Sequence, residues 1–111
     1  IRDVSRGECA AMERGRLGDI YHLSPDSGVA VRDVVRMICE TMGVAFEKAT
    51  RAVGERLGQD AAYVIDSSKA RRELGWSPAI SIGEGIKGVI RWVEENWEEI
   101  QRQPLEYIHK A

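Results

Sequence analysis

The chain has 111 residues, enough for one domain that buries about 65% of the surface of its unfolded form. Its 16 lysines and arginines nearly balance 18 aspartates and glutamates, and the net charge of −2 gives no general attraction to nucleic acid or anionic lipid. No apolar run approaches the ~20 residues that cross a bilayer, and no signal peptide is visible. We therefore expect a cytoplasmic protein with no nucleic-acid partner and no membrane partner.

The cysteines and histidines predict neither a disulfide nor a metal site. Cys9 and Cys39 lie in helix-like segments with apolar neighbours, so we expect buried thiols in a reducing compartment. His22 and His109 have no partner at metal-ligand spacing. The chain opens on Ile1 rather than methionine and runs directly into a helix cap, which indicates a piece of a longer chain.

The first part of the chain predicts a helix, a strand and a loop. Asp3 is the expected N-cap of the helix, which ends at Gly15 and Gly18. Residues 19–23 alternate in hydropathy as a strand does. Residues 25–28 then form a loop rich in turn-forming residues.

A second helix is the clearest pattern in the chain. Its apolar residues fall at helical spacing: Val31, Val34, Val35, Ile38, Cys39 and Met42. Gly43 is the expected residue after its end. A short strand is expected around residues 45–47.

The second half predicts two further helices. Residues 63–65 form a brief extended stretch, and Asp66 or Ser67 caps a short helix that stops at Gly75. Trp76 is placed to fold back on that helix. Ser81 and Glu84 form a capping box that starts the longest helix, whose apolar stripe continues to Ile100 and which Pro104 closes.

These elements amount to about four helices and two or three short strands, an α/β (α+β) fold class in a single domain, 1–111. No glycine-rich loop follows a strand, so the chain carries no dinucleotide-binding fingerprint of its own.

The segment 56–60 has the chemistry of a diphosphate contact. The guanidinium of Arg56 can form paired, charge-assisted hydrogen bonds to phosphate, Gly58 permits a tight loop, and Asp60 can accept from sugar hydroxyls. Tyr63 could stack on a nucleobase or fill a half-buried strand position. The alternative to a binding site is a polar surface turn with a weak ion pair between Arg56 and Asp60.

The run RLGQDAAYVIDSSKARRELGW, residues 56–76, resembles a stretch of extended short-chain dehydrogenases/reductases that act on nucleotide sugars. The nearest likeness is to the dTDP-glucose 4,6-dehydratase group, whose version reads Arg-Pro-Gly-His-Asp, two residues, Tyr, two residues, Asp, then Ser-Lys and Leu-Gly. Residues 1–4, 18–23, 81–92 and 104–110 also resemble that family, in the same order.

The resemblance implies that the chain is a C-terminal substrate-binding domain. In the family, the arginine matching Arg56 contacts the diphosphate of a nucleotide-sugar substrate, and the residues matching Gln59, Asp60 and Tyr63 lie near the nucleotide. Ser27 stands where dehydratases often carry an asparagine that helps to hold the nucleotide.

The catalytic groups and NAD would then belong to an N-terminal Rossmann domain of the same chain, so we expect no catalytic residue and no cofactor site here. The resemblance further implies a homodimer in the full-length enzyme, an inactive fragment, and an exposed apolar face where the Rossmann domain docks and through which the fragment self-associates.

Three departures from the family pattern concern the site. Leu57 and Gln59 replace proline and histidine, which makes the loop less rigid, and Ser27 replaces the asparagine. Ala30 replaces a common Ser or Thr cap and weakens that helix start by about 1 kcal/mol. The same lobe occurs in 4-epimerases and decarboxylases, and a non-catalytic α/β interaction module is a further alternative.

Overall fold

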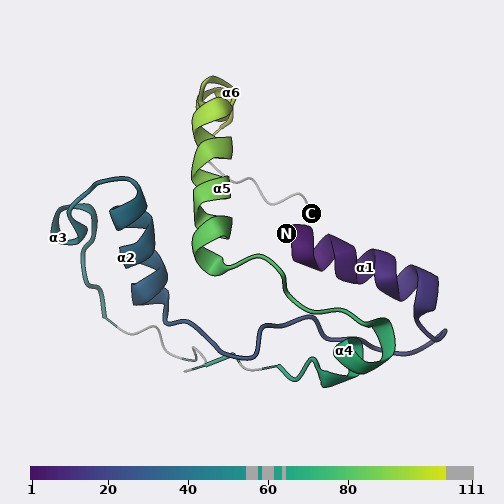
Figure 1. Ribbon diagram of the computed structural model, residues 1–111. Helices are drawn as coiled ribbons and strands as arrows, with labels where there is room; N and C mark the ends of the chain where they lie inside the picture. Colours follow the sequence, from purple (N-terminus) through teal and green to yellow (C-terminus); the bar gives the residue numbers. More distant parts are fainter. Residues whose placement is uncertain (55–57, 59–61, 64, 105–111) are drawn as a thin grey trace. The chain divides into compact units, whose positions relative to one another are not determined.

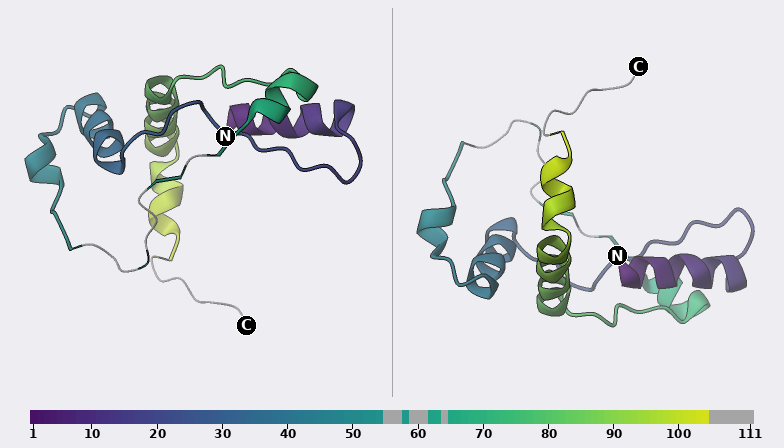
Figure 2. Two further views of the ribbon diagram at one scale, coloured as in Figure 1. Left: turned by 90° about the horizontal axis from the view of Figure 1, so that it is seen from below. Right: turned by 90° about the horizontal axis from the view of Figure 1, so that it is seen from above.

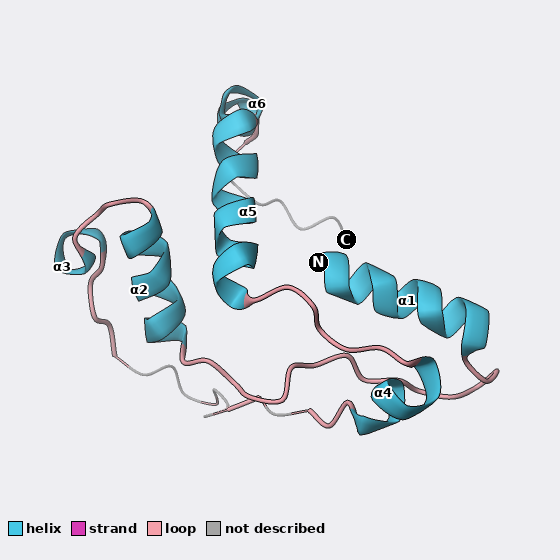
Figure 3. Cartoon of the chain, viewed as in Figure 1, coloured by secondary structure: helices cyan, strands magenta, loops and turns pink. Residues whose placement is uncertain are grey.

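The computed structural model describes residues 1–54, 58, 62–63 and 65–104, and within them it contains six helices and no strand (Figures 1 and 3). The helices are α1 (Arg2–Arg14), α2 (Val31–Thr41), α3 (Phe46–Ala49), α4 (Ser68–Leu74), α5 (Ile82–Glu95) and α6 (Trp97–Arg102). They belong to two compact units, Ile1–Ser81 and Ile82–Ala111.

The expected α/β fold class is therefore wrong for the part of the chain that is described. Residues 19–23 are not a strand, because no strand lies among the described residues for their backbone to pair with, and side-chain contacts of Asp19 and Tyr21 hold them instead. The strand expected around residues 45–47 is replaced by the start of α3. Of the stretch 63–65, Tyr63 and Ile65 lie outside any element, and Val64 lies outside the described residues.

The core of the first unit lies between α1 and α4, which run side by side in both views of Figure 2. Its buried members are Ala10, Ala70, Leu74 and Trp76, with Ala11, Tyr21 and Leu23 packed against them. Gly7 is also buried there, and a Cβ at this position would meet the side chain of Leu23 and lie 3.1 Å from Trp76 Nε1. The segment predicted as a strand thus contributes two core side chains without forming a sheet.

The first turn of α1 differs from the prediction. Ile1, not Asp3, is the N-cap, and Asp3 lies within the helix. The carboxylate of Asp3 accepts the N–H groups of Ala79 and Ile80 at 3.1 and 2.9 Å, so it caps backbone far along the chain rather than its own helix. The predicted end of the helix is confirmed, since Gly15 is the C-cap.

Helix α2 follows the sequence pattern closely. It ends at Thr41, and Gly43 takes a left-handed conformation with φ of 67° beyond the end, as expected. The N–H of Val44 donates to Cys39 O at 2.9 Å, and that of Gly43 to Glu40 O at 3.2 Å, a Schellman arrangement. Ala30 is the N-cap and supplies no side-chain hydrogen bond.

The two cysteines behave differently. Cys39 is buried, as expected, whereas Cys9 is exposed on α1, so the prediction of a second buried thiol is wrong. The helical stripe of α1 that faces α4 passes through Gly7 and Ala10, which leaves position 9 on the open side.

In the second unit, the expected continuous helix is interrupted. Asn96 separates α5 from α6, and both its side-chain amide and its backbone N–H donate to Trp92 O, at 2.8 and 3.1 Å. No residue of either helix is buried, and Val89, Trp92 and Trp97 are each more than half exposed. The tryptophans at 92 and 97 are therefore not core residues, unlike Trp76.

Candidate functional site

The predicted site residues fall on two segments, 24–28 and 56–66. Arg56, Gln59 and Asp60 lie outside the described residues. Gly58 is described, and its φ of 77° is the left-handed conformation that a tight turn at a glycine requires. This conformation agrees with the turn expected at that position.

Two predicted contact residues are accessible. The side chain of Tyr63 is 78% exposed, so it is not the half-buried strand tyrosine that was the alternative. Ser27 is exposed in a bend between the loop and α2. Both residues are open to a ligand, and neither is needed by the core.

A buried hydroxyl joins the two segments. Ser67, only 4% exposed, directly follows the segment that holds Tyr63, and its Oγ donates to Ser24 O at 2.8 Å. A polar group in such a position is held by its hydrogen bond, because an unpaired one would cost free energy. The start of α4 is therefore fixed to the loop that precedes Ser27.

An arginine makes a second connection to the same loop. Arg71 Nη2 lies 2.8 Å from Asp26 Oδ1 and 3.4 Å from Ser24 O. The guanidinium lies 6.0 Å from the ring of Trp76, a core residue. Arg71 thus ties the loop to the core.

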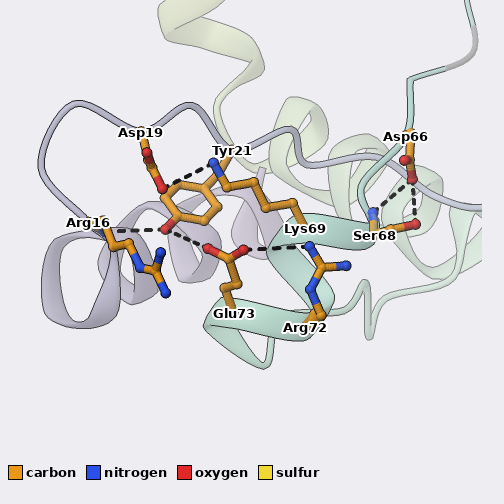
Figure 4. A network of polar contacts seen from close by, with 8 residues as sticks. All are labelled: Arg16, Asp19, Tyr21, Asp66, Ser68, Lys69, Arg72 and Glu73. Carbon is orange, nitrogen blue, oxygen red and sulfur yellow. Dashed lines mark hydrogen bonds and ion pairs between the residues drawn. The ribbon is translucent and has the colours of Figure 1, made fainter.

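Asp66 caps the start of α4 locally (Figure 4). Its Oδ1 accepts the backbone N–H of Ser68 at 2.9 Å and the Ser68 hydroxyl at 2.5 Å. These two bonds, the hydroxyl first, lower the pKa of Asp66 below its ordinary value of 3.8. The carboxylate is ionised at neutral pH, which suits a cap and not a general acid.

On another side of α4, a polar network holds residues 16–21 (Figure 4). Tyr21 donates its hydroxyl to Glu73 Oε2 at 3.2 Å and accepts the backbone N–H of Arg16 at 3.2 Å. Lys69 lies 4.7 Å from the Tyr21 ring centroid and 3.1 Å from Asp19 Oδ2. Because its charge is paired in this way, Lys69 stabilises the packing of residues 16–21 against α4.

Sequence reasoning did not identify the supporting role of four residues: Ser24, Asp26, Ser67, which was expected only as a possible helix cap, and Arg71. Their contacts span 43 to 47 positions. Such pairs leave no periodic signal, and the only cue in the sequence was their closeness to Ser27 and Tyr63.

Among the described residues, the features of a metal site and of a membrane span are both missing. No group of three or more metal-ligating side chains occurs among them, and none of their helices is long and apolar enough to cross a membrane.

A hollow of about 520 Å³ at the α5–α6 junction is lined by Asn96, Trp97, Arg102 and four glutamates, 94, 95, 98 and 99. That acidic lining would repel a diphosphate, so the hollow is not the candidate site.

Comparison with known proteins finds several relatives that are named dTDP-glucose 4,6-dehydratase. The chain is 32% identical over 107 residues to the dTDP-glucose 4,6-dehydratase of Streptomyces antibioticus, covering 94% of the chain and 32% of the relative. The enzyme of that name from Streptomyces niveus is 30% identical over 96% of the chain and 32% of the relative. The one from Escherichia coli is 32% identical over 89% of the chain and 30% of the relative.

The chain thus spans about a third of the length of the curated relatives that it matches. No family model matches it, and no solved structure matches it.

Proposed function

We propose that this chain is the substrate-binding lobe of an NAD-dependent nucleotide-sugar 4,6-dehydratase and takes a dTDP-glucose-like substrate. The observation that carries the proposal is the similarity to dTDP-glucose 4,6-dehydratases, which extends over nearly the whole chain rather than over one motif. We assign the candidate contacts to Ser27, Arg56, Gln59, Asp60 and Tyr63.

The arrangement of the described residues supports this assignment. The bond from Ser67 to Ser24 brings the segment carrying Tyr63 and the loop carrying Ser27 to one end of α4. Substrate contacts placed on loops and held by a packed helix are common in enzymes. A nucleoside diphosphate that touched both loops would meet the exposed aromatic ring of Tyr63 and the exposed hydroxyl of Ser27.

The remaining parts of the proposed enzyme would be supplied by sequence outside this lobe. The described residues contain no strand, and so no strand, glycine-rich turn and helix of the kind that cradles a dinucleotide. NAD would be held by an N-terminal Rossmann domain, and its chemistry would be hydride transfer. This chain's part is to bind and orient the nucleotide sugar, in a cytoplasmic homodimer.

The test is turnover by the full-length gene product. We expect dTDP-glucose to lose one molecule of water when it is incubated with the protein and NAD. Mass spectrometry of the product measures this loss. Conversion without a change in mass would identify an epimerase, and loss of carbon dioxide from a nucleotide uronic acid a decarboxylase. Failure to bind or convert dTDP-, UDP- or GDP-sugars would leave the non-catalytic interaction module as the answer.

A second arm uses the 111-residue chain by itself, which we expect to be inactive. Turnover of dTDP-glucose by this chain would contradict the division of labour between the two parts.

A further inference from the structure

Arg71 links the core of the first unit to the loop that carries Ser27. One face of its guanidinium lies near the ring of Trp76, which is 5% exposed. One nitrogen at its tip, Nη2, contacts both the Asp26 carboxylate and the Ser24 carbonyl. Because a guanidinium is rigid and planar, these contacts fix the loop at two points relative to a buried residue.

Asp26 presents an electrostatic difficulty next to a diphosphate. The side chain of Asp26 is 83% exposed. Because Asp26 directly precedes Ser27 in the chain, its negative charge lies close to any anion that Ser27 contacts. Two negative charges a few ångströms apart repel each other unless a cation is interposed. Arg71, whose Nη2 lies 2.8 Å from Asp26 Oδ1, is a cation that offsets the charge of this carboxylate.

We propose that Arg71 is a positioning residue of the candidate substrate site, which orients the 24–27 loop and neutralises Asp26 so that Ser27 can approach a nucleoside diphosphate. This inference rests on the proposed function. Arg71 itself need not touch the ligand, since its charge is paired with Asp26 and its hydrogen bond goes to Ser24 O.

The experiment measures dTDP affinity of the full-length protein by calorimetry in four variants. Arg71→Gln removes the charge and one contact, and we expect about tenfold weaker binding. Arg71→Lys keeps the charge without the planar fork and should lose less. Adding Asp26→Asn to Arg71→Gln should recover the part of the loss that is due to charge, whereas a purely structural tie would gain nothing from it.

Arg36→Gln is the matched control. Arg36 also pairs with a carboxylate, Asp33 at 2.9 Å, and lies 5.4 Å from an aromatic ring, that of Phe46. It belongs to the α2–α3 contact and not to the candidate site, so its loss should leave dTDP affinity unchanged. If Arg71→Gln does not fold, Arg71→Lys decides the question.

Two further readouts separate the possible failures. In Arg71→Gln we expect faster hydrogen exchange in residues 24–30 and a raised KM for dTDP-glucose with kcat retained. Unchanged dTDP affinity in Arg71→Gln, or an equal loss in Arg36→Gln, would overturn this inference and leave the proposed function standing. Absence of dTDP binding by the wild-type protein would overturn both.

Discussion

The carboxylate of Asp3 accepts the backbone N–H of Ile80 at 2.9 Å, across 77 positions of sequence. The same oxygen accepts the N–H of Ala79, and the indole N–H of Trp76 donates to the carbonyl of Asp3 at 2.8 Å. One residue in the first turn of α1 therefore fixes the segment that leaves α4. Arg6 lies 3.0 Å from the other carboxylate oxygen and balances its charge.

The first prediction is that this contact makes stability depend on pH. The hydrogen bond from Ile80 is the largest influence and lowers the pKa of Asp3 below 3.8, while partial desolvation opposes it and Ala79 and Arg6 add to it. A carboxyl group with a lower pKa in the folded state stabilises the fold above its unfolded pKa, and this stabilisation is lost as pH falls through the folded pKa.

Asp3→Asn should therefore lower the melting temperature at neutral pH, and the difference from wild type should shrink as pH falls below 3.8. Thermal unfolding followed by circular dichroism over a pH series measures both. Glu8→Gln, at an exposed position on the same helix, is the control. A pH-independent difference for Asp3→Asn would show that the charge is not what matters.

The second prediction concerns Gly75, which ends α4 with φ of 61°. The N–H of Trp76 reaches back to Ala70 O at 3.3 Å, so the left-handed turn places the tryptophan on the core. Gly75→Ala should destabilise the protein by about 1 kcal/mol, because a Cβ is strained in this conformation. Denaturant unfolding gives the difference.

Gly88→Ala is the opposite case and serves as the comparison. Gly88 lies within α5, and a Cβ there would meet nothing within 4 Å. Alanine is favoured over glycine inside a helix by about 1 kcal/mol, so this change should stabilise α5. Equal effects of the two substitutions would rule out backbone conformation as the cause.

The third prediction is that a cap can be added to α2. Ala30 occupies the N-cap position with extended backbone angles, φ −63° and ψ 139°, and has no side-chain acceptor. The hydroxyl of Ala30→Ser should accept a hydrogen bond from a backbone N–H of the first turn and stabilise the protein by about 1 kcal/mol. Ala30→Val, which lacks a side-chain acceptor, should not stabilise the protein. A gain in stability with valine would indicate that backbone propensity, rather than capping, is the cause.

The fourth prediction tests the proposed diphosphate contact. Arg56→Ala in the full-length protein should raise the KM for dTDP-glucose by about tenfold or more, since a charge-assisted bond to phosphate contributes about 1.5–3 kcal/mol. Arg51→Ala, at a nearby exposed arginine, should leave KM unchanged. Steady-state kinetics decides, and an unchanged KM for Arg56→Ala would return residues 56–60 to the surface-turn interpretation.

The fifth prediction is that the 111-residue chain self-associates through apolar side chains that stand open. Val89 and Trp92 on α5 are 62% and 58% exposed. Sedimentation velocity should show concentration-dependent association, which Val89→Lys with Trp92→Glu should weaken. A chain that stays monomeric at high concentration would argue against an exposed apolar docking face. Lys87→Glu, at an exposed position of α5, is the control for an effect of added charge alone.

The local features of the sequence predicted local structure well. The apolar spacing from Val31 to Met42 and the glycines at 43 and 75 determined where α2 and α4 run and stop, because capping and periodicity act within a few residues. The local sequence features gave a wrong prediction where the same pattern is compatible with two structures. Residues 19–23 alternate like a strand, yet strand formation depends on a partner that the sequence pattern does not supply.

The sequence by itself determined α1, α2 and α4, the uncapped start at Ala30, and the similarity that supports a nucleotide-sugar function. Only the tertiary structure decided that Asp3 holds Ile80, that Ser67 and Arg71 hold the loop before Ser27, and that Cys9 is exposed. The physical reason is distance along the chain. A hydrogen bond between residues 43 or 77 positions apart exists only after the core of Leu74 and Trp76 has brought them together.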